Sequence, residues 1–461
     1  MGSTNRALLI LTAIVLISRI FFLDAGYGSE EDAWGVGLTA KHMAQSGTYE
    51  ASRLPGHPVQ EYFYAAIINN VSIYILNGIT AIFSLVACLY FYLILEKLKF
   101  KHSFIGALTL AFTPIIYMHS TDCMDYVWAL GFIMMSYYWL IHDRFIIAGI
   151  LLAFAVGCRI TSAVFFIPYV LQLYLYKKAL WNNLCKLSLP LLLLSCLFYF
   201  PVYHKYGPGF FHYYDQFPYP SFSKVIFKET IGIWGTIGYF GLLFFLLIVL
   251  INVIRNKTYK VFINGLSKVW FLIIVLYTAL YFMLPQKSAY FIPVIPFVIL
   301  LAAQYLNKIS FYVFSCSILV SSYFLGINLG DKTRGAEPSR LNINMVMSGQ
   351  IVHLDFLHGP VIDDYLKRKS RMDFTDEIIK KAALINVKSV IISGWWLNPV
   401  LNQLVPLNKW NKINFVYCIR EEEMHDFIKH GYSIYYLPEM DSINDIRYKI
   451  CTTKSLAKPL F

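Results

Sequence analysis

The most informative shortage in this sequence is of charged residues. Only 14% of its 461 residues are Asp, Glu, Lys or Arg, whereas 57% are hydrophobic. Soluble globular proteins carry about 25% charged residues, so this chain has too few charges for a water-facing surface over its whole length. Lipid is the solvent that such a surface requires, and the composition predicts an integral membrane protein.

Other absences narrow the class further. The eight cysteines show no metal-binding spacing, and only Cys418 and Cys451 are candidates for a disulfide in an oxidising compartment. No internal repeat or low-complexity tract is present. No small-residue cleavage site follows the first apolar run, so we expect that run to be a retained span. The net charge of +12 is spread over short loops, which argues against nucleic acid as a partner.

Apolar runs of membrane-helix character recur along the first 328 residues. A crossing helix needs about 20 mostly apolar residues, and the sequence predicts about eleven such segments. They are residues 7–23, 73–95, 104–117, 126–141, 145–156, 161–176, 187–203, a run ending at 255, 269–284, 290–308 and 311–325. The fold class expected is therefore an α-helical polytopic membrane protein.

Charge in the loops gives the expected orientation. Basic residues such as Lys97, Arg144, Arg255 and Lys308 all fall on one side of the predicted spans. Because basic loops favour the cytoplasm, we expect a cytoplasmic N-terminus and a first outer loop over residues 24–64. Eleven spans would also place the C-terminal residues outside the cytoplasm.

The composition changes after the last apolar run. Residues 363–387 show helical spacing among charges, and "VKSVIISGWW", "NFVYCI" and "YSIYYL" read as strands. "EEEMHDFIKHG" between the last two reads as a helix. The sequence therefore predicts a transmembrane module over residues 1–328 and a small extracytoplasmic α/β domain over residues 329–461.

Acidic residues lie at the predicted outer ends of the helices. Glu31 and Asp32 follow the first span, and Asp122 and Asp125 precede the fourth. A solvated helix start is one interpretation, because acids are favoured near helix N-termini. The other is catalytic: a carboxylate at the membrane surface can act as a general base.

Two isolated cations lie on the same predicted side. Arg159 separates two apolar runs, and Lys287 opens "KSAYFIPVIP". Arg159 could simply extend its charged end to the interface. Lys287 is disfavoured there by the positive-inside rule, which indicates an anionic partner.

Four motifs in this order resemble the GT-C superfamily of membrane glycosyltransferases, in particular protein O-mannosyltransferases and aminoarabinose transferases. The resemblance covers about the first 310 residues. It rests on Asp32 followed by Met43, Gly47 and "RLPGHP", on Asp125, on "GCRITSAVFFIP", and on "KSAYFIPVIP" with Lys287 and Tyr290.

The resemblance implies an inverting transfer of a sugar from a polyprenyl-phosphate donor to a glycan, lipid or protein hydroxyl. Asp32 would be the catalytic acid of the family, with Glu31 as its neighbouring alternative and Asp125 as the second acid. The phosphate would be met by His57, Arg159 and Lys287, with Tyr290 and Asp122 among the substrate-binding residues. No cofactor is required, and a divalent metal is optional.

Two other functions fit the same pattern of charges. One is a transporter or flippase of lipid-linked sugars, which usually shows inverted repeats. The other is an O-antigen ligase or polymerase, which has a different fold and similar substrates.

Overall fold

Most of the chain is helical. The computed structural model describes residues 3–176, 179–216, 219–256, 265–329, 338–347, 350–404, 412–437 and 456–461. The helices of the apolar part are α1 (Ser3–Ile20), α2 (Glu31–Ser46), α3 (Pro58–Ile67), α4 (Ile73–Lys97), α5 (Ser103–Ala111), α6 (Pro114–Met118), α7 (Tyr126–Ile141), α8 (Phe145–Cys158), α9 (Phe166–Tyr176), α10 (Leu180–Tyr206), α11 (Phe222–Glu229), α12 (Ile231–Asn256), α14 (Ser267–Met283), α15 (Ile295–Tyr305) and α16 (Lys308–Tyr323). Short 3-10 segments are η1 (Ile160–Phe165), η2 (Pro208–Gln216) and η3 (Ser288–Val294).

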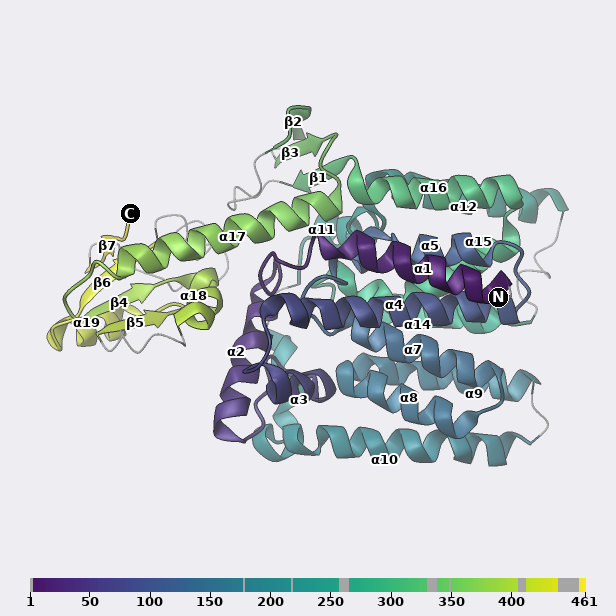
Figure 1. Cartoon of the computed structure of the whole chain (residues 1–461), viewed down its shortest axis with the longest axis horizontal. Coiled ribbons are helices and arrows are strands. Elements are labelled where there is room, and N and C mark those ends of the chain that lie inside the picture. The colour runs from purple at the N-terminus through teal and green to yellow at the C-terminus, as the bar shows by residue number, and fades with distance from the viewer. Residues whose placement is uncertain are drawn as a thin grey trace.

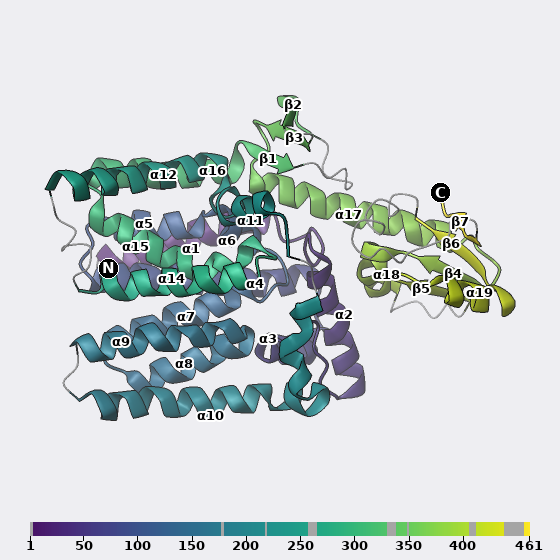
Figure 2. The same ribbon diagram turned by 180° about the vertical axis from the view of Figure 1, so that it is seen from behind.

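These helices form a bundle with two different ends. The long apolar helices run side by side, and α2 crosses one end of them (Figures 1 and 2). The C-terminal region projects from that same end, whereas the N-terminus lies at the other. We call the end crossed by α2 the α2 end.

Membrane-spanning character is supported for part of the bundle. Among the described residues, four helical segments are long and apolar enough to cross a membrane: Ile73–Lys97, Leu180–Tyr206, Ile231–Asn252 and Ser288–Tyr305. Four further apolar helices are shorter. Each of the eleven predicted apolar segments is helical, but eleven crossings are not established.

Several of the predicted apolar segments are not continuous α-helices, and residues in the sequence account for some of the interruptions. The segment over 104–117 is split into α5 and α6 because Pro114 begins the second helix. Two others, over 161–176 and 290–308, begin as the 3-10 segments η1 and η3. In α12, Gly235 has a φ of +66°, in the left-handed region, and kinks the helix.

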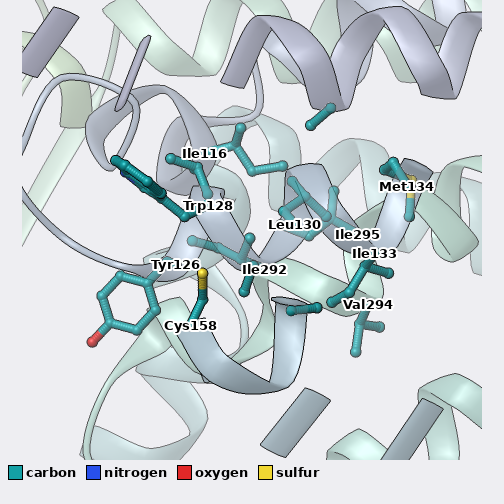
Figure 3. Close-up of a cluster of buried hydrophobic side chains, with 14 of the residues drawn as sticks. Ile116, Tyr126, Trp128, Leu130, Ile133, Met134, Cys158, Ile292, Val294 and Ile295 are labelled. Carbon is teal, nitrogen blue, oxygen red and sulfur yellow. The ribbon is translucent and has the colours of Figure 1, made fainter. Parts of the chain in front are cut away.

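The buried core of the bundle lies where α6, α7, α8 and η3 meet. Figure 3 shows this core, with Trp128 of α7 beside Ile116 of α6 and Ile292 of η3. Trp128 stacks on Phe83 with ring centroids 4.0 Å apart, and its indole N–H donates to Thr80 Oγ1 at 3.2 Å. The N-terminus of α7 is thus fixed by packing from several helices.

The C-terminal region contains two small sheets. Strands β1 (Gly326–Leu329), β3 (Gln350–Asp355) and β2 (Asn342–Met347) pair antiparallel in the order β1-β3-β2, a sheet that the sequence did not predict. Strands β5 (Ile413–Val416), β4 (Ser389–Ile392), β6 (Ser433–Tyr436) and β7 (Lys458–Pro459) form a parallel sheet in that order. The remaining elements are α17 (Pro360–Ala382), η4 (Gly394–Trp396), α18 (Leu397–Leu404) and α19 (Glu421–Lys429).

The expected elements of this region are found. The predicted helix over 363–387 is α17, the predicted strands are β4, β5 and β6, and the predicted helix between the last two strands is α19. Cys418 is disulfide-bonded, and its candidate partner Cys451 lies outside the described residues.

A buried arginine joins the C-terminal region to the bundle. Arg368 of α17 is 1% exposed. Its guanidinium donates to the carbonyls of Ala25 at 3.1 Å and Gly26 at 3.2 Å, and to Thr121 at both Oγ1 (3.0 Å) and the carbonyl (2.6 Å). The helix is therefore held against the loop before α2 and the turn after α6.

We expect Arg368→Met to destabilise the protein. The change leaves the buried carbonyls of Ala25 and Thr121 without the donor that Arg368 supplies, at about 1–3 kcal/mol for each unsatisfied group. A loss of about 3 kcal/mol or more in the free energy of unfolding is the expected result, measured as thermal unfolding in detergent. Lys380→Met, at an exposed position in the last turn of α17, is the matched control. An equal effect of both changes would contradict the role given to Arg368.

Candidate functional site

Lys287 joins two carboxylates at the start of α2. Glu30 is the N-cap of that helix and Asp32 lies in its first turn. The ammonium of Lys287 donates to Glu30 Oε2 at 2.5 Å and also contacts Asp32 Oδ2. Asp32 is 35% exposed and Lys287 22%. The sequence placed these residues on one side of the membrane, and the structure brings them into contact.

Arg53 extends this contact to Asp125. Its Nη1 lies 3.7 Å from Asp32 Oδ2, and its Nη2 pairs with Asp125 Oδ1. The sequence analysis did not single out Arg53, although it opens the "RLPGHP" return loop. An arginine in a polar loop gives no signal by composition, and only its place in that motif could have marked it.

Asp125 is the most enclosed member of the site. Its side chain is fully buried, and Arg159 Nη1 donates to its Oδ2 at 2.6 Å. Asp125 occupies the N-cap position of α7, but its side chain makes no capping hydrogen bond. The interpretation of Asp125 as a simple helix cap is therefore wrong, because both oxygens face arginines.

Arg159 is held on its faces by aromatic rings. Its guanidinium carbon lies 4.3 Å from the ring centroid of Tyr126 and 5.0 Å from that of Tyr290, which places both within cation–π range. The side chain is only 12% exposed, so Arg159 does not extend to the interface. Its guanidinium points to Asp125 instead.

The two predicted cations occupy matching backbone positions. Arg159 and Lys287 are each extended residues, with φ of −148° and −140°, directly before the 3-10 segments η1 and η3. An extended residue at a helix start projects its side chain away from the helix axis. This shared local structure explains why both apolar segments present a cation at the α2 end.

Together these residues form what we call the charge network: Glu30, Lys287, Asp32, Arg53, Asp125 and Arg159. It contains three carboxylates and three cations in alternation. The four residues Asp32, Asp125, Arg159 and Lys287 that the sequence suggested would converge do so, with Arg53 as the link.

A second buried acid shapes the loop that carries Arg53. Glu61 of α3 is 1% exposed and accepts hydrogen bonds from Tyr49 Oη at 2.6 Å, the Ser52 N–H at 2.7 Å and the His57 N–H at 3.0 Å. These bonds fold residues 49–57 around one carboxylate. The sequence analysis missed Glu61, because an acid within the predicted outer loop over residues 24–64 resembles an ordinary solvent-exposed loop residue.

His57 is a buried residue beside the charge network. Its Nδ1–H donates to the Cys158 carbonyl at 2.7 Å and lies 3.4 Å from Asp125. Burial lowers the pKa of His57 to about 3, with Arg53 and Arg159 adding to the effect against the opposing pull of Asp125. The neutral ring lies beside the charge network, and the contact of His57 with a donor phosphate stays a prediction.

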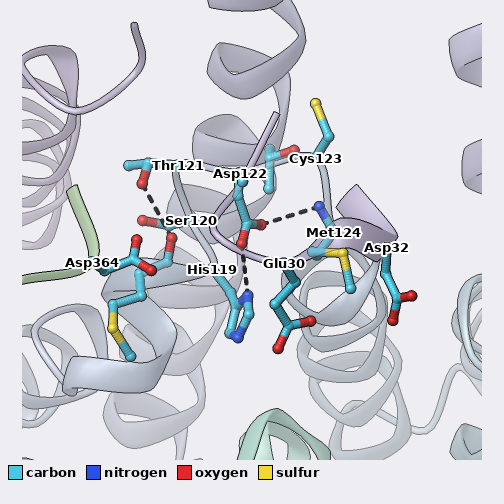
Figure 4. A network of polar contacts seen from close by, with 12 residues as sticks. Glu30, Asp32, His119, Ser120, Thr121, Asp122, Cys123, Met124 and Asp364 are labelled. Carbon is cyan, nitrogen blue, oxygen red and sulfur yellow. Dashed lines mark hydrogen bonds and ion pairs between the residues drawn. The ribbon is translucent and has the colours of Figure 1, made fainter. Parts of the chain in front are cut away.

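Two other predicted residues, Asp122 and Glu31, lie beside the charge network rather than within it; Figure 4 shows Asp122 with its partners. Asp122 pairs with His119 Nδ1 at 2.8 Å and accepts from the Met124 N–H at 3.1 Å. Glu31 accepts from Asn398 of α18 at 3.4 Å. Of the two neighbouring acids at the start of α2, Asp32 pairs with Lys287 and Arg53 of the charge network, whereas Glu31 contacts Asn398 of the C-terminal region.

Asp32 is held in its ionised form by its cationic neighbours. Burial alone would raise its pKa, but the charges of Lys287 and Arg53 outweigh burial and lower the pKa to about 2. Asp125 likewise has a pKa below its ordinary value, because His57, Arg159 and Arg53 outweigh the effect of burial. Asp32 and Asp125 are therefore ionised near neutral pH.

A small pocket borders the charge network. It has a volume of about 240 Å³ and is lined by Ser29, Glu30, Ile115, Met118, His119, Lys228, Gly232, Gln286, Lys287, Ser288, Ala289 and Asp364. Lys287 is thus shared between the pocket and Asp32. Among the described residues, no group of three or more His, Cys, Asp or Glu side chains is arranged to hold a metal ion.

Comparison with protein-family models, with curated proteins and with solved structures found no match to this chain.

The buried neutral state of His57 predicts a pH dependence of stability. Its pKa is about 3 in the folded protein and near 6.5 otherwise, so the unfolded chain binds more protons between these values. Stability should fall as the pH is lowered from about 6.5 toward 3. We expect His57→Gln to reduce this slope when thermal unfolding is compared at about pH 7.5 and about pH 5. Identical slopes for the variant and the wild type would contradict a buried, neutral His57.

Proposed function

We propose that this protein is a membrane glycosyltransferase of the GT-C type, which moves a sugar from a polyprenyl-phosphate donor to an acceptor hydroxyl. The observation that supports it best is the charge network, in which Asp32 is paired with Lys287 beside a pocket. A carboxylate to take a proton and a cation to receive a phosphate are the two groups this transfer needs.

The proposal includes a location at the non-cytoplasmic face. The charge network lies at the α2 end, opposite the N-terminus (Figure 1). The loops at the other end carry the basic residues that favour the cytoplasm. A disulfide at Cys418 in the C-terminal region fits an oxidising compartment. The donor lipid would lie in the bilayer, with its phosphate at this face.

The proposed reaction begins with an exchange of partners at Lys287. When the donor phosphate takes the ammonium of Lys287, Asp32 loses its main counter-charge, and its pKa rises from about 2 toward its ordinary value. Asp32 then accepts the proton of the acceptor hydroxyl. The hydroxyl oxygen attacks the anomeric carbon from the side opposite the phosphate, and the configuration inverts.

The leaving group departs with the electron pair of the broken bond. The carbon–oxygen bond to the lipid phosphate breaks as the new glycosidic bond forms, and the phosphate gains a negative charge. Lys287 lies where that charge develops. Arg53 and Arg159 stay paired with Asp125 and hold the geometry, so their positions do not change during the step.

A transporter of lipid-linked sugars is the main competing function. Such proteins commonly show inverted repeats, and the sequence shows none. An assay with a radiolabelled polyprenyl-phosphate sugar in liposomes separates the two functions. A transferase releases free polyprenyl phosphate and labels an acceptor, whereas a transporter moves intact donor between the leaflets. Movement without cleavage would refute the proposal.

We expect Asp32→Asn to lower the rate of transfer by about 10²–10⁴-fold, which is the usual contribution of a general base. The amide keeps the shape of the side chain but cannot take the proton. The measurement is release of polyprenyl phosphate at saturating donor, with the elution profile in detergent as a check of folding.

Glu31→Gln is the informative comparison, because Glu31 contacts Asn398 instead of Lys287. It should keep most of the transfer rate. If Glu31→Gln abolishes transfer while Asp32→Asn does not, the two acids have been assigned the wrong way round.

A further inference from the structure

One wall of the pocket comes from the C-terminal region. Asp364 lies near the start of α17, and its side chain is 16% exposed. It lines the same pocket as Lys287, which is 77 positions earlier in the chain (364 minus 287). Figure 4 shows Asp364, His119 and Glu30 in one cluster, close to Asp32. No part of the proposed transfer described above uses Asp364.

The position of Asp364 is fixed by its own helix. One turn later, Arg368 is bonded to the carbonyls of Ala25 and Gly26, and Arg371 donates to the Ser29 carbonyl. These bonds attach α17 to the loop that leads into α2. Asp364 is therefore held at the pocket by the same contacts that position Glu30.

The lining of the pocket carries charges of both signs. Lys287 and Lys228 supply cations, and Lys228 is itself anchored by donation to the Gln286 carbonyl. Glu30 and Asp364 supply carboxylates. Burial raises the pKa of Asp364, against the opposing effect of Arg368. His119 is oriented by its hydrogen bond to Asp122 and adds a ring nitrogen to the lining.

A lining with both cations and carboxylates matches one class of ligand. A phosphate is attracted to the lysines and repelled by carboxylates, so Asp364 suits an uncharged part of the ligand that donates hydrogen bonds. Sugar hydroxyls are such donors. The volume of about 240 Å³ is below the roughly 300–1,000 Å³ of pockets for drug-sized ligands, which favours one monosaccharide unit over a longer glycan.

We propose that this pocket binds a monosaccharide phosphate, and that Asp364 is a sugar-specificity residue supplied by the C-terminal region. The inference rests on the proposed function, since it assigns the donor sugar to this pocket. It adds that α17 is part of the site, so the C-terminal region takes part in choosing the donor.

The test is calorimetric titration of the full-length protein in detergent. The probes are inorganic phosphate and the 1-phosphates of glucose, mannose, galactose and arabinose. We expect at least one sugar phosphate to bind the wild type more tightly than inorganic phosphate. Asp364→Asn should weaken that binding by about tenfold or more, the effect of losing a hydrogen bond to a charged acceptor. It should not weaken the binding of inorganic phosphate, because phosphate is repelled by the carboxylate that the change removes.

The matched control is Asp376→Asn, which removes an equal charge from an exposed position of the same helix. It should bind every probe as the wild type does. Equal affinities of Asp364→Asn and Asp376→Asn for the preferred sugar phosphate would overturn the inference. So would a wild type that prefers none of the sugar phosphates to inorganic phosphate.

The two proposals fail in distinguishable ways. Sugar-phosphate binding that depends on Asp364, without any release of polyprenyl phosphate, would refute the transferase and keep the pocket. Release of polyprenyl phosphate at the wild-type rate and with unchanged sugar preference in Asp364→Asn would keep the transferase and refute the role of Asp364.

Discussion

The buried carboxylate of Asp125 is the constraint on which the site depends. An ionised group without exposure is stable only when opposite charges and hydrogen bonds replace water. Arg53 and Arg159 supply both, and they come from the return loop before α3 and the junction of α8 with η1. Removing either arginine would leave the buried carboxylate with one arginine in place of two, so two separate parts of the chain are tied to the N-terminus of α7.

The charge network is unequal from one end to the other. Asp125 has no exposure, whereas Asp32 is 35% and Glu30 33% exposed. Ion pairs that water reaches are weaker than enclosed ones and exchange partners readily. The Asp125 end is thus structural, and the Lys287 end can open for an anion. The difference in exposure means that the enclosed ion pairs at Asp125 fix the structure, while the exposed ion pairs at Lys287 are easier to replace.

The sequence predicted the parts of this site that break a pattern. Arg159 and Lys287 interrupt apolar runs, and Asp125 stands at the start of one, so each was visible against its surroundings. Arg53 and Glu61 were not, because a charged residue in a polar loop is ordinary and only its partners give it meaning. The helices were likewise predicted from apolar runs, but the number of crossings is not established, since four of the described helical segments are long and apolar enough to cross a membrane. The sheet β1-β3-β2 was missed because its strands are only four to six residues long.

The buried contacts of α17 argue against a C-terminal region that moves independently of the bundle. A domain that folded and moved independently would contact the bundle through a polar, exchangeable surface. Here Arg368 is 1% exposed and donates hydrogen bonds to the carbonyls of Ala25 and Thr121 in the bundle. Asn402 of α18 donates to the Trp34 carbonyl within α2 at 2.8 Å. Hydrogen bonds of this kind cannot be lost without leaving buried carbonyls unpaired. The boundary near residue 329 therefore divides the sequence by composition, and under the proposed function both parts contribute to one site, because α2 carries Asp32 on one side of this interface and α17 carries Asp364 on the other.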